Sequence, residues 1–414
     1  MANVFQNTDW LSMEYLRMLV NQLEVAPFFN TDYNKEYTQP FAIGATARIP
    51  YPERWLVTEG IAYQPQGIDQ RTTEVTIDQT PGIHFEYNAL EKALQMGRSK
   101  DWIRKNLIMP QMKQMANHID QKCIEYATKR IPNTVGQLGT APTSLDLYAD
   151  ARAILDENAA PPGERGMIIT PRMQNAATKV GVGYFNPTDE ISKQYKSGSM
   201  GKYSNFDFYS SNNLGSLTAG TRAGTVTVNG AGQSGNSLNI NCTSGDTFFE
   251  GEPFTIALVD NVNPVSRETT LVLKQFCIAQ DLTATGSTAT LQLRRDGPSS
   301  AIEGPGSKYQ NVASLPGNTA ALTFWPGTTS PNGKSGKIGL GLTNHAFALV
   351  GVPMEQPKAV EESFYMRDPG TGLALLYVRQ YDNVTMKMTN RLQTLFGFGD
   401  LYPGQAAVRV ASLS

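Results

Sequence analysis

Residue types that carry catalysis or bind metal ions are few and scattered in this chain. No histidine is paired with a second ligand at a metal-binding spacing such as H-E-x-x-H; the three are His84, His118 and His345. No G-x-S-x-G sequence, which places a nucleophilic serine on a sharp turn, is present. Carboxylate pairs such as Glu361-Glu362 have no neighbour that would make them an acid and a base. The sequence therefore predicts no enzyme, no cofactor and no metal site.

The segment Gly327-Thr-Thr-Ser-Pro-Asn-Gly333-Lys334-Ser335 comes nearest to a phosphate-binding loop. Such a loop has four residues between its glycines, because its backbone amides curl around one phosphate group. Here five residues intervene, and one of them is Pro331, which has no amide hydrogen to donate. We interpret the segment as a flexible linker.

Three cysteines are dispersed along the chain: Cys123, Cys242 and Cys277. A small, odd number does not make a disulfide framework. We therefore interpret them as free thiols of a protein in a reducing cytoplasm. The alternative is a bond between Cys242 and Cys277, which can lie close in the fold.

Composition points to a protein whose surface is largely covered by other subunits. The 414 residues exceed one ordinary domain, so two domains, or one with a large insertion, are expected. Charged residues make up only 17%, against roughly 25% in a typical soluble protein. Contact surfaces are depleted of charge, whereas a monomer needs surface charge for solubility. The formal net charge of −2 argues against a dedicated nucleic-acid binder.

Neither a membrane anchor nor secretion is expected. The longest apolar runs, 346–353 and 373–378, are far shorter than the ~20 residues that cross a bilayer. The N-terminus lacks the basic start and apolar stretch of a signal peptide.

The distribution of methionine divides the sequence into a middle stretch and two flanking stretches. All 14 methionines fall within 1–200 or 354–388, whereas the stretch 222–325 is dense in Thr, Ser, Gly and Asn. This stretch contains runs in which apolar and polar residues alternate, such as Leu238-Asn-Ile-Asn and Thr288-Ala-Thr-Leu-Gln-Leu. Alternation between turn-rich segments is typical of β-strands. We therefore predict an inserted all-β module, a barrel or sandwich of about six strands.

The first flank begins with a predicted helix and a long hairpin. Asp9 can cap a helix that ends at Pro27, and its apolar stripe is Met13, Leu16, Val20 and Leu23. Its polar face is not basic, so the helix should pack against protein, of its own chain or of a neighbour. Residues 45–85 read as an extended hairpin with little core of its own, which is marginal in water without a partner.

A long helix is predicted over 99–130, with a kink or break at Pro110. It contains seven Lys or Arg residues against three Asp or Glu. This excess can mark a solvated face or a face toward DNA. Beyond it we predict a helix over 145–158, a buried strand over 166–170 and a helix that begins at Pro171. After the middle stretch, strands are predicted at 346–352, 374–378, 384–388 and 408–410, with a turn over 397–403.

The order of these elements resembles the major capsid protein of tailed bacteriophages, which has the HK-ninety-seven (Johnson) fold. More narrowly, it is similar to the P-twenty-two-type coat proteins, which carry an inserted β-barrel. Three stretches support the resemblance: Gly198-Ser-Met-Gly-Lys-Tyr-Ser-Asn-Phe-Asp-Phe-Tyr-Ser-Ser-Asn-Asn, Asn344-His-Ala-Phe-Ala-Leu-Val with Pro353 after it, and the glycine turn, proline and last strand of 397–410.

The resemblance implies an α+β capsid fold with four parts. Residues 1–40 would be the N-terminal arm and 41–86 an extended loop that lies over a neighbouring subunit. Residues 87–221 and 326–414 would form a discontinuous core with a spine helix at 99–130, and 222–325 would be the inserted β-domain.

The resemblance also implies partners and a location. The chain would assemble with itself into pentamers and hexamers of an icosahedral shell, inside the cytoplasm of a bacterial host and then in the virion. A scaffolding protein and a portal would be partners, and packaged double-stranded DNA would be contacted weakly and without sequence specificity, since a strongly basic wall would hold it too firmly. The alternatives are another virion protein of the tail or fibre and, from a different class, a cytoplasmic enzyme with a β-rich accessory domain.

Charges of alternating sign along the predicted hairpin are the candidate contacts between subunits: Arg48, Arg54, Glu59, Asp69 and Arg71. On a monomer each would be solvated and would matter little. Across a repeated contact they would set the register and exclude wrong pairings. Reversal of Arg54 is therefore expected to spare the fold and to impair assembly.

Overall fold

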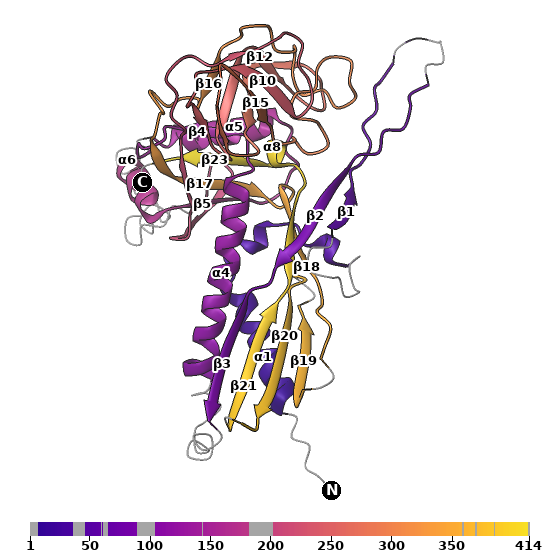
Figure 1. The fold of residues 1–414 in the computed structure, drawn as a ribbon, viewed down its shortest axis with the longest axis vertical. Helices are drawn as coiled ribbons and strands as arrows, with labels where there is room; N and C mark the ends of the chain where they lie inside the picture. Colours follow the sequence, from indigo (N-terminus) through magenta and orange to yellow (C-terminus); the bar gives the residue numbers. More distant parts are fainter. Residues whose placement is uncertain are drawn as a thin grey trace. The chain divides into compact units, whose positions relative to one another are not determined.

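The computed structural model describes residues 7–35, 46–58, 60, 65–88, 104–142, 144–181, 202–357, 360–368, 371–384 and 386–412. Helices and strands are mixed along the chain, which confirms the predicted α+β class (Figure 1). The described residues form two compact units. Unit 1 draws them from Met1–Arg48, Glu74–Cys123 and Ala348–Gly399, and unit 2 from Ile49–Thr73, Ile124–Phe347 and Asp400–Ser414.

Unit 1 contains a four-stranded antiparallel sheet in the order β19-β20-β21-β3. Its strands are β3 (Gly82–Asn88), β19 (Glu362–Arg367), β20 (Ala374–Asp382) and β21 (Lys387–Thr394). The strand predicted from Val384 begins only at Lys387, because Val384 is exposed in the turn that joins β20 to β21.

Helix α1 (Asn7–Gln22) packs on this sheet. Tyr15 of α1 stacks on Tyr377 of β20, with 6.3 Å between ring centroids, and its hydroxyl donates a hydrogen bond to Gln111 at 3.2 Å. The predicted apolar stripe was wrong at two positions: Met13 is exposed and Val20 is only half-buried. The buried face instead runs through Tyr15, Leu16 and Leu19, because the ring of Tyr15 packs on the sheet. The side chain of Asp9, the predicted cap, lies outside the described residues.

A buried carboxylate explains why α1 ends five residues before Pro27. The side chain of Asp120 accepts hydrogen bonds from the backbone amides of Glu24, Val25 and Ala26, at 2.8, 3.1 and 3.0 Å. Burial raises the pKa of Asp120, although these three hydrogen bonds oppose the shift. The chain then forms two short 3₁₀ turns, η1 (Ala26–Phe28) and η2 (Asp32–Lys35).

The long helix is wound in two ways. Residues of η3 (Arg104–Ile108) form a π-helix, and α4 (Met109–Thr128) continues as an α-helix. Pro110 therefore stands where the winding changes from π to α, which is the local irregularity that a proline within a helix produces. One face of α4 is buried through Met112, Ile119 and Cys123, and His118 lies on the exposed face. The predicted start at 99–103 lies outside the described residues.

The strands on either side of the extended loop belong to a second sheet, in the order β1-β2-β22-β18. They are β1 (Thr46–Pro50), β2 (Thr72–Gln79), β18 (Phe347–Gly351) and β22 (Phe396–Asp400). Val75 and Ile77 are fully buried here, so the base of the hairpin has more core than the sequence predicted.

The turn predicted over 397–403 was wrong in its first half, because Gly397 and Gly399 lie in β22 beside β2. A Cβ atom on Gly397 would come within 2.2 Å of the Thr76 carbonyl oxygen, and one on Gly399 within 2.5 Å of Val75. The glycines therefore permit close packing of strands and do not mark a turn.

Unit 2 has a mixed sheet in the order β4-β23-β17-β5-β7-β6, with β8 paired to β17. Its strands are β4 (Thr134–Gly136), β5 (Arg165–Ile169), β6 (Lys202–Tyr203), β7 (Phe206–Ser210), β8 (Ser216–Thr218), β17 (Ser335–Thr343) and β23 (Ala407–Ala411). Helices α5 (Asp146–Glu157), α6 (Pro171–Gly181) and α8 (Pro403–Ala406) accompany it. Tyr148, Leu155 and Phe206 belong to its apolar core.

Residues 222–325, called the Met-free stretch from here on, fold into three small antiparallel sheets within unit 2. The strand orders are β15-β10-β9, β11-β14 and β13-β12-β16. Their strands are β9 (Thr227–Val228), β10 (Ser237–Asn241), β11 (Thr247–Phe248), β12 (Pro253–Val262), β13 (Thr269–Cys277), β14 (Leu282–Thr283), β15 (Thr288–Gln292) and β16 (Leu322–Phe324). The chain leaves the mixed sheet at Thr218 and returns opposite it at Ser335. All three cysteines are free thiols.

A buried glutamate joins the two ends of this stretch. Glu252 forms an ion pair with Arg222, and its carboxylate also accepts a hydrogen bond from the indole nitrogen of Trp325 at 3.0 Å. The side chains of Arg222 and Glu252 are only 5% and 1% exposed. The Arg222 guanidinium lies 3.6 Å from the ring centroid of Phe324. Burial of this guanidinium lowers the pKa of Arg222.

Candidate functional site

The extended loop, residues 51–71, contains three of the five predicted contact residues. Arg54, Asp69 and Arg71 lie in the loop, Arg48 lies in β1 before it, and Glu59 lies outside the described residues. The loop runs out from β1 and returns to β2 (Figure 1). Against expectation, part of it is bound by its own chain.

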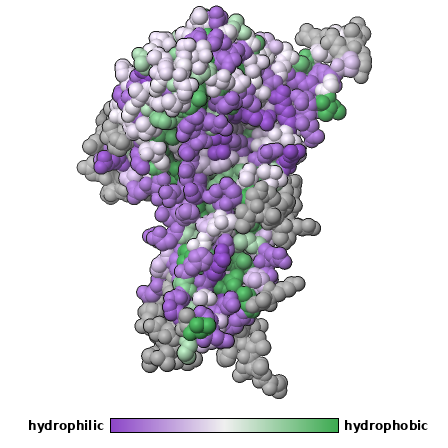
Figure 2. All heavy atoms as spheres, viewed as in Figure 1, coloured by the Kyte–Doolittle hydropathy of each residue, from purple (hydrophilic) through white to green (hydrophobic). Residues whose placement is uncertain are grey.

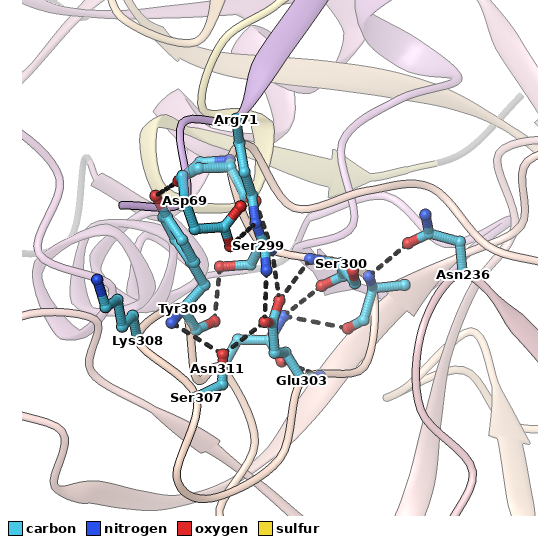
Figure 3. A network of polar contacts seen from close by, with 12 residues as sticks. Asp69, Arg71, Asn236, Ser299, Ser300, Glu303, Ser307, Lys308, Tyr309 and Asn311 are labelled. Carbon is cyan, nitrogen blue, oxygen red and sulfur yellow. Dashed lines mark hydrogen bonds and ion pairs between the residues drawn. The ribbon is translucent and has the colours of Figure 1, made fainter. Parts of the chain in front are cut away.

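Arg71 is bound by Glu303, a residue of the Met-free stretch. Its Nη1 and Nη2 donate to Oε2 and Oε1 of Glu303 at 2.8 and 2.9 Å, a two-pronged ion pair (Figure 3). Nη1 also donates to the Pro298 carbonyl oxygen at 2.9 Å, and Nε donates to Asp69 at 3.2 Å. The side chains of Arg71 and Glu303 are 21% and 13% exposed. Paired hydrogen bonds between charged groups fix direction as well as distance.

Glu303 is held in its ionised form. Burial raises the pKa of this carboxyl, but hydrogen bonds from Arg71, from the Ser307 hydroxyl and from the Ser300 amide outweigh it, and the net pKa lies below the ordinary 4.5. The hydrogen bonds from Ser307 and Ser300 measure 2.5 and 2.9 Å. The hydrogen bond with Glu303 is in turn the main reason that the pKa of Arg71 is raised.

Tyr309 supports the same arm of the loop from beneath. Its ring is almost fully buried, with the Arg71 guanidinium 4.1 Å from the ring centroid and that of Arg54 at 5.9 Å. Its hydroxyl donates to the backbone oxygen of Asp69 at 2.9 Å. A cation over an aromatic face is attracted by the ring's negative π-surface.

Lys308 joins the two arms of the loop. Its ammonium group lies 3.3 Å from a carboxylate oxygen of Glu53 on the first arm, and it donates to the backbone oxygen of Gly67 on the second. It also lies 4.5 Å from the ring centroid of Trp55. One side chain therefore contacts both arms.

The segment that receives the loop, residues 298–311, is called the loop seat here. It has no regular secondary structure, and polar side chains hold its turns together. Asn311 donates to the Ser300 carbonyl at 2.8 Å and accepts from the Glu303 amide at 2.8 Å, and Asn236 accepts from the Ala301 amide at 2.9 Å (Figure 3). The two bonds of Asn311 hold the seat together, and the bond of Asn236 connects it to the residue just before β10.

Farther from its base the loop exposes apolar side chains. Val57 is 96% exposed, and Trp55 and Ile68 are exposed as well. Figure 2 shows green, apolar side chains on this loop beside purple, polar ones. Single exposed apolar residues are common on protein surfaces, but several on one extended loop indicate a contact surface.

Arg48 has a different environment from Arg71. It pairs with Glu74 through one contact of 3.3 Å, and the two side chains are 72% and 56% exposed. Arg48 and Arg71 were predicted to act alike, and the structure separates them by exposure.

Sequence reasoning missed the loop seat, although a signal was present. Between Asp296 and Lys334 the chain has only two charged residues, Glu303 and Lys308, and both bind the loop. Two isolated charges in a charge-poor stretch mark positions that need a partner. Nothing in the sequence indicates that the partner is the loop, more than 200 residues away.

The described part of the chain contains no group of three or more His, Cys, Asp or Glu side chains that could hold a metal ion. The segment that comes nearest to a phosphate loop joins β16 to β17 and is followed by a strand, so it lacks the helix whose N-terminus would face a phosphate. Within the described ranges, no helix combines the length and apolar character needed to cross a membrane.

The basic end of α4 is partly used within unit 2. Lys129 forms an ion pair with Glu250 at 3.3 Å, and Arg130 forms one with Asp400 at 3.3 Å. The Arg130 guanidinium also lies 3.8 Å from the ring centroid of Tyr126. These two cations therefore have acidic partners within their own chain.

No family model matches the chain, and no curated protein matches it. Among solved structures, it is similar to one of Mycobacterium phage Che8, at 11% identity over 94% of this chain and 90% of that chain, with a TM-score of 0.47. It is also similar to the capsid of Cyanophage P-SCSP1u, at 11% identity over 91% and 86%, with a TM-score of 0.42. The coat protein I-domain of CUS-3 matches at 24% identity over 24% of this chain and 94% of that chain, with a TM-score of 0.18.

Proposed function

We propose that this chain is the major capsid protein of a tailed double-stranded DNA bacteriophage and that its copies form an icosahedral shell. The observation that carries the proposal is the extended loop. Its base is held by ion pairs within the chain, while Trp55, Val57 and Ile68 remain exposed beyond that base. Burial of such side chains against a second copy is favourable by roughly 25 cal/mol per Å² of apolar surface.

The finer architecture belongs to the same proposal. The order of an N-terminal arm (1–40), an extended loop hairpin (41–86), a spine helix (99–130) and an α/β core supports an HK-ninety-seven-like fold. Residues 222–325 would be its inserted β-domain, and the pairing of Thr218 with Ser335 supports an excursion that leaves and re-enters the core at one place. The eight strands of this stretch, in three small antiparallel sheets, suit a small barrel or sandwich.

The proposed role is structural and not enzymatic. A shell subunit needs many weak contacts with copies of itself, and a charge content of 17% suits a surface that is largely covered. We propose pentamers and hexamers as its assemblies, with a scaffolding protein, a portal and weakly held DNA as partners. Assembly would take place in the host cytoplasm.

The test is expression of the full chain followed by negative-stain microscopy and light scattering at increasing protein concentration. Closed shells are expected, either uniform or aberrant in size. The variant Val57→Asp should lower the yield of shells at least about tenfold while the unassembled subunit keeps its melting temperature, because a side chain that is 96% exposed has few contacts to lose within the subunit.

The matched control is Val57→Thr, which has nearly the same shape and no charge, and it should assemble almost as well as the parent chain. A parent chain that stays monomeric at all concentrations would contradict the capsid proposal. Normal shells from Val57→Asp would show that the loop does not mediate the contact at this position.

A further inference from the structure

We infer that the loop seat, residues 298–311, sets the direction of the extended loop, and that Glu303 and Tyr309 are positioning residues for assembly. The inference rests on the proposed function, since it assigns the seat a role in the contact between copies. Its basis is the set of contacts between the loop and the seat within one chain.

The loop has little structure of its own to hold it in place. Among its described residues, three hydrogen-bonded contacts join the two arms. At the base, the Tyr51 amide donates to the Arg71 carbonyl oxygen at 2.9 Å. Farther out, the side-chain amide of Gln66 pairs with the backbone of Leu56 at 2.5 and 2.9 Å, and the Asp69 amide donates to Glu53 at 2.9 Å. A two-stranded excursion with so few cross-links is marginal in water. Its direction must therefore come from what it rests on.

The seat contacts both arms, and it does so near the base of the loop. Glu303 binds Arg71 with two hydrogen bonds, Tyr309 binds the Asp69 backbone, and Lys308 contacts Glu53 and Gly67. Three points on the second arm and one on the first restrict both the tilt and the twist of the loop. A single contact would leave the loop free to swing.

The charges around the seat select one docked arrangement. Arg267 donates from Nη2 to the Lys308 carbonyl at 2.9 Å, and the nearby positive charge of Arg54 helps burial to lower the pKa of Arg267. Arg71 has a carboxylate to receive it, whereas the positive charge of Arg54 acts unfavourably on that of Arg267. A register in which Arg54 moved further toward Arg267 would bring like charges together, which is unfavourable.

A loop that is already directed when it meets a neighbour loses less conformational freedom on binding. The seat should therefore raise the rate of assembly without touching the neighbouring copy. Removal of the Glu303 charge leaves Arg71 with only its hydrogen bonds to Asp69 and Pro298, so the loop should sample more directions.

The first measurement is the distance distribution between spin labels at Val57→Cys and Thr285→Cys in the unassembled full chain. Cys242→Ser removes the more accessible native thiol, and Cys123 and Cys277 are buried. Addition of Glu303→Gln should widen the distribution about twofold or more, and Tyr309→Phe should widen it less, because it keeps the ring beneath Arg71. The control Glu268→Gln, at an exposed carboxylate of the same module, should leave it unchanged.

The second measurement is the initial rate of assembly of unlabelled Glu303→Gln and Glu268→Gln chains, followed by light scattering, with far-ultraviolet circular dichroism to show that both are folded. Glu303→Gln should assemble about tenfold more slowly, which corresponds to 1.4 kcal/mol, and Glu268→Gln at the parent rate.

An unchanged distance distribution in both Glu303→Gln and Tyr309→Phe would overturn the inference that the loop seat sets the direction of the loop. A widened distribution with an unchanged assembly rate would overturn its role in assembly. If the parent chain forms no shells at all, the capsid proposal fails, while the spin-label distances still decide whether the seat directs the loop.

Discussion

Two arginine–glutamate pairs flank the same hairpin and show what burial does to one kind of interaction. Arg48–Glu74 lies on the strands with 72% and 56% of its side chains exposed, and it has one contact of 3.3 Å. The side chains of Arg71 and Glu303 are 21% and 13% exposed and share two hydrogen bonds. The Ser307 hydroxyl and the Ser300 amide donate further hydrogen bonds to the same carboxylate. Water competes for the first pair and is largely excluded from the second, so only the second can fix a geometry.

A third pair, Arg222–Glu252, extends the comparison to full burial. Both side chains are nearly inaccessible, and the carboxylate also receives the Trp325 indole and the Gly220 amide. The three pairs form a series in which exposure decreases while chemistry stays constant. Each can be broken by the same change of a carboxylate to an amide.

The largest effect is expected for Glu252→Gln. Loss of the charge leaves Arg222 buried without compensation, which costs about 3–5 kcal/mol of the free energy of unfolding. Urea unfolding followed by tryptophan fluorescence would measure it, since Trp325 contacts the site. A loss below about 1 kcal/mol would mean that water reaches this pair and that the series does not hold.

The second effect is expected for Glu303→Gln, with a loss of about 1–2 kcal/mol, because Arg71 keeps its hydrogen bonds to Pro298 and Asp69. Chemical denaturation of the unassembled chain gives the value. A double-mutant cycle with Arg71→Gln would measure the interaction energy between Arg71 and Glu303. A value near zero would mean that this pair stabilises the fold no more than the exposed pair Arg48–Glu74.

The third effect is a pH dependence of the same pair. The pKa of Glu303 is lowered in the folded chain, so its contribution to stability is complete above the ordinary 4.5 and is lost as pH falls through the folded pKa. The stability difference between the parent and Glu303→Gln should therefore shrink as pH falls below 4.5. Melting temperatures of both chains from pH 6 to about pH 3 test this, and a constant difference would contradict it.

A small effect on stability is expected for Arg54→Glu. Arg54 lies 5.9 Å from the Tyr309 ring centroid and near the cation of Arg267, so its reversal removes one weak contact and one repulsion. The melting temperature should change by less than the equivalent of ~0.5 kcal/mol, while shell yield falls if the loop contacts a neighbour. Unfolding of the isolated subunit by this change would place Arg54 in an internal core.

The smallest effect is expected for Glu74→Gln, which breaks the pair with Arg48, at about 0–0.5 kcal/mol in the unassembled chain. The same denaturation assay at low and high salt measures it, and any loss should vanish at high salt because exposed charges are screened. A loss as large as that of Glu303→Gln would show that exposure does not separate the two pairs.

Local pattern was enough to predict much of the fold. The predicted helix over 145–158 is α5, the buried strand over 166–170 is β5, and the helix at Pro171 is α6. Alternation also located strands of the Met-free stretch, such as β10 and β15. These elements follow from the sequence because periodicity and turn residues record which face of a segment is buried.

Glycines in the last part of the chain misled the same kind of reasoning. Gly397 and Gly399 were interpreted as a turn, yet they lie in a strand whose backbone approaches β2 too closely for any Cβ atom. Glycine permits both turns and close approach, and only the neighbouring strand distinguishes them.

The sequence alone determined that Arg71 and Glu303 carry opposite charges, but only the tertiary structure decided that they meet. They are separated by 232 positions, and their contact depends on where two distant segments without regular structure are placed. The same holds for Arg48, whose charge was equally visible and whose partner Glu74 is an exposed side chain of β2. Local periodicity reports burial within one segment, whereas the value of a charge depends on which other segment excludes water from it.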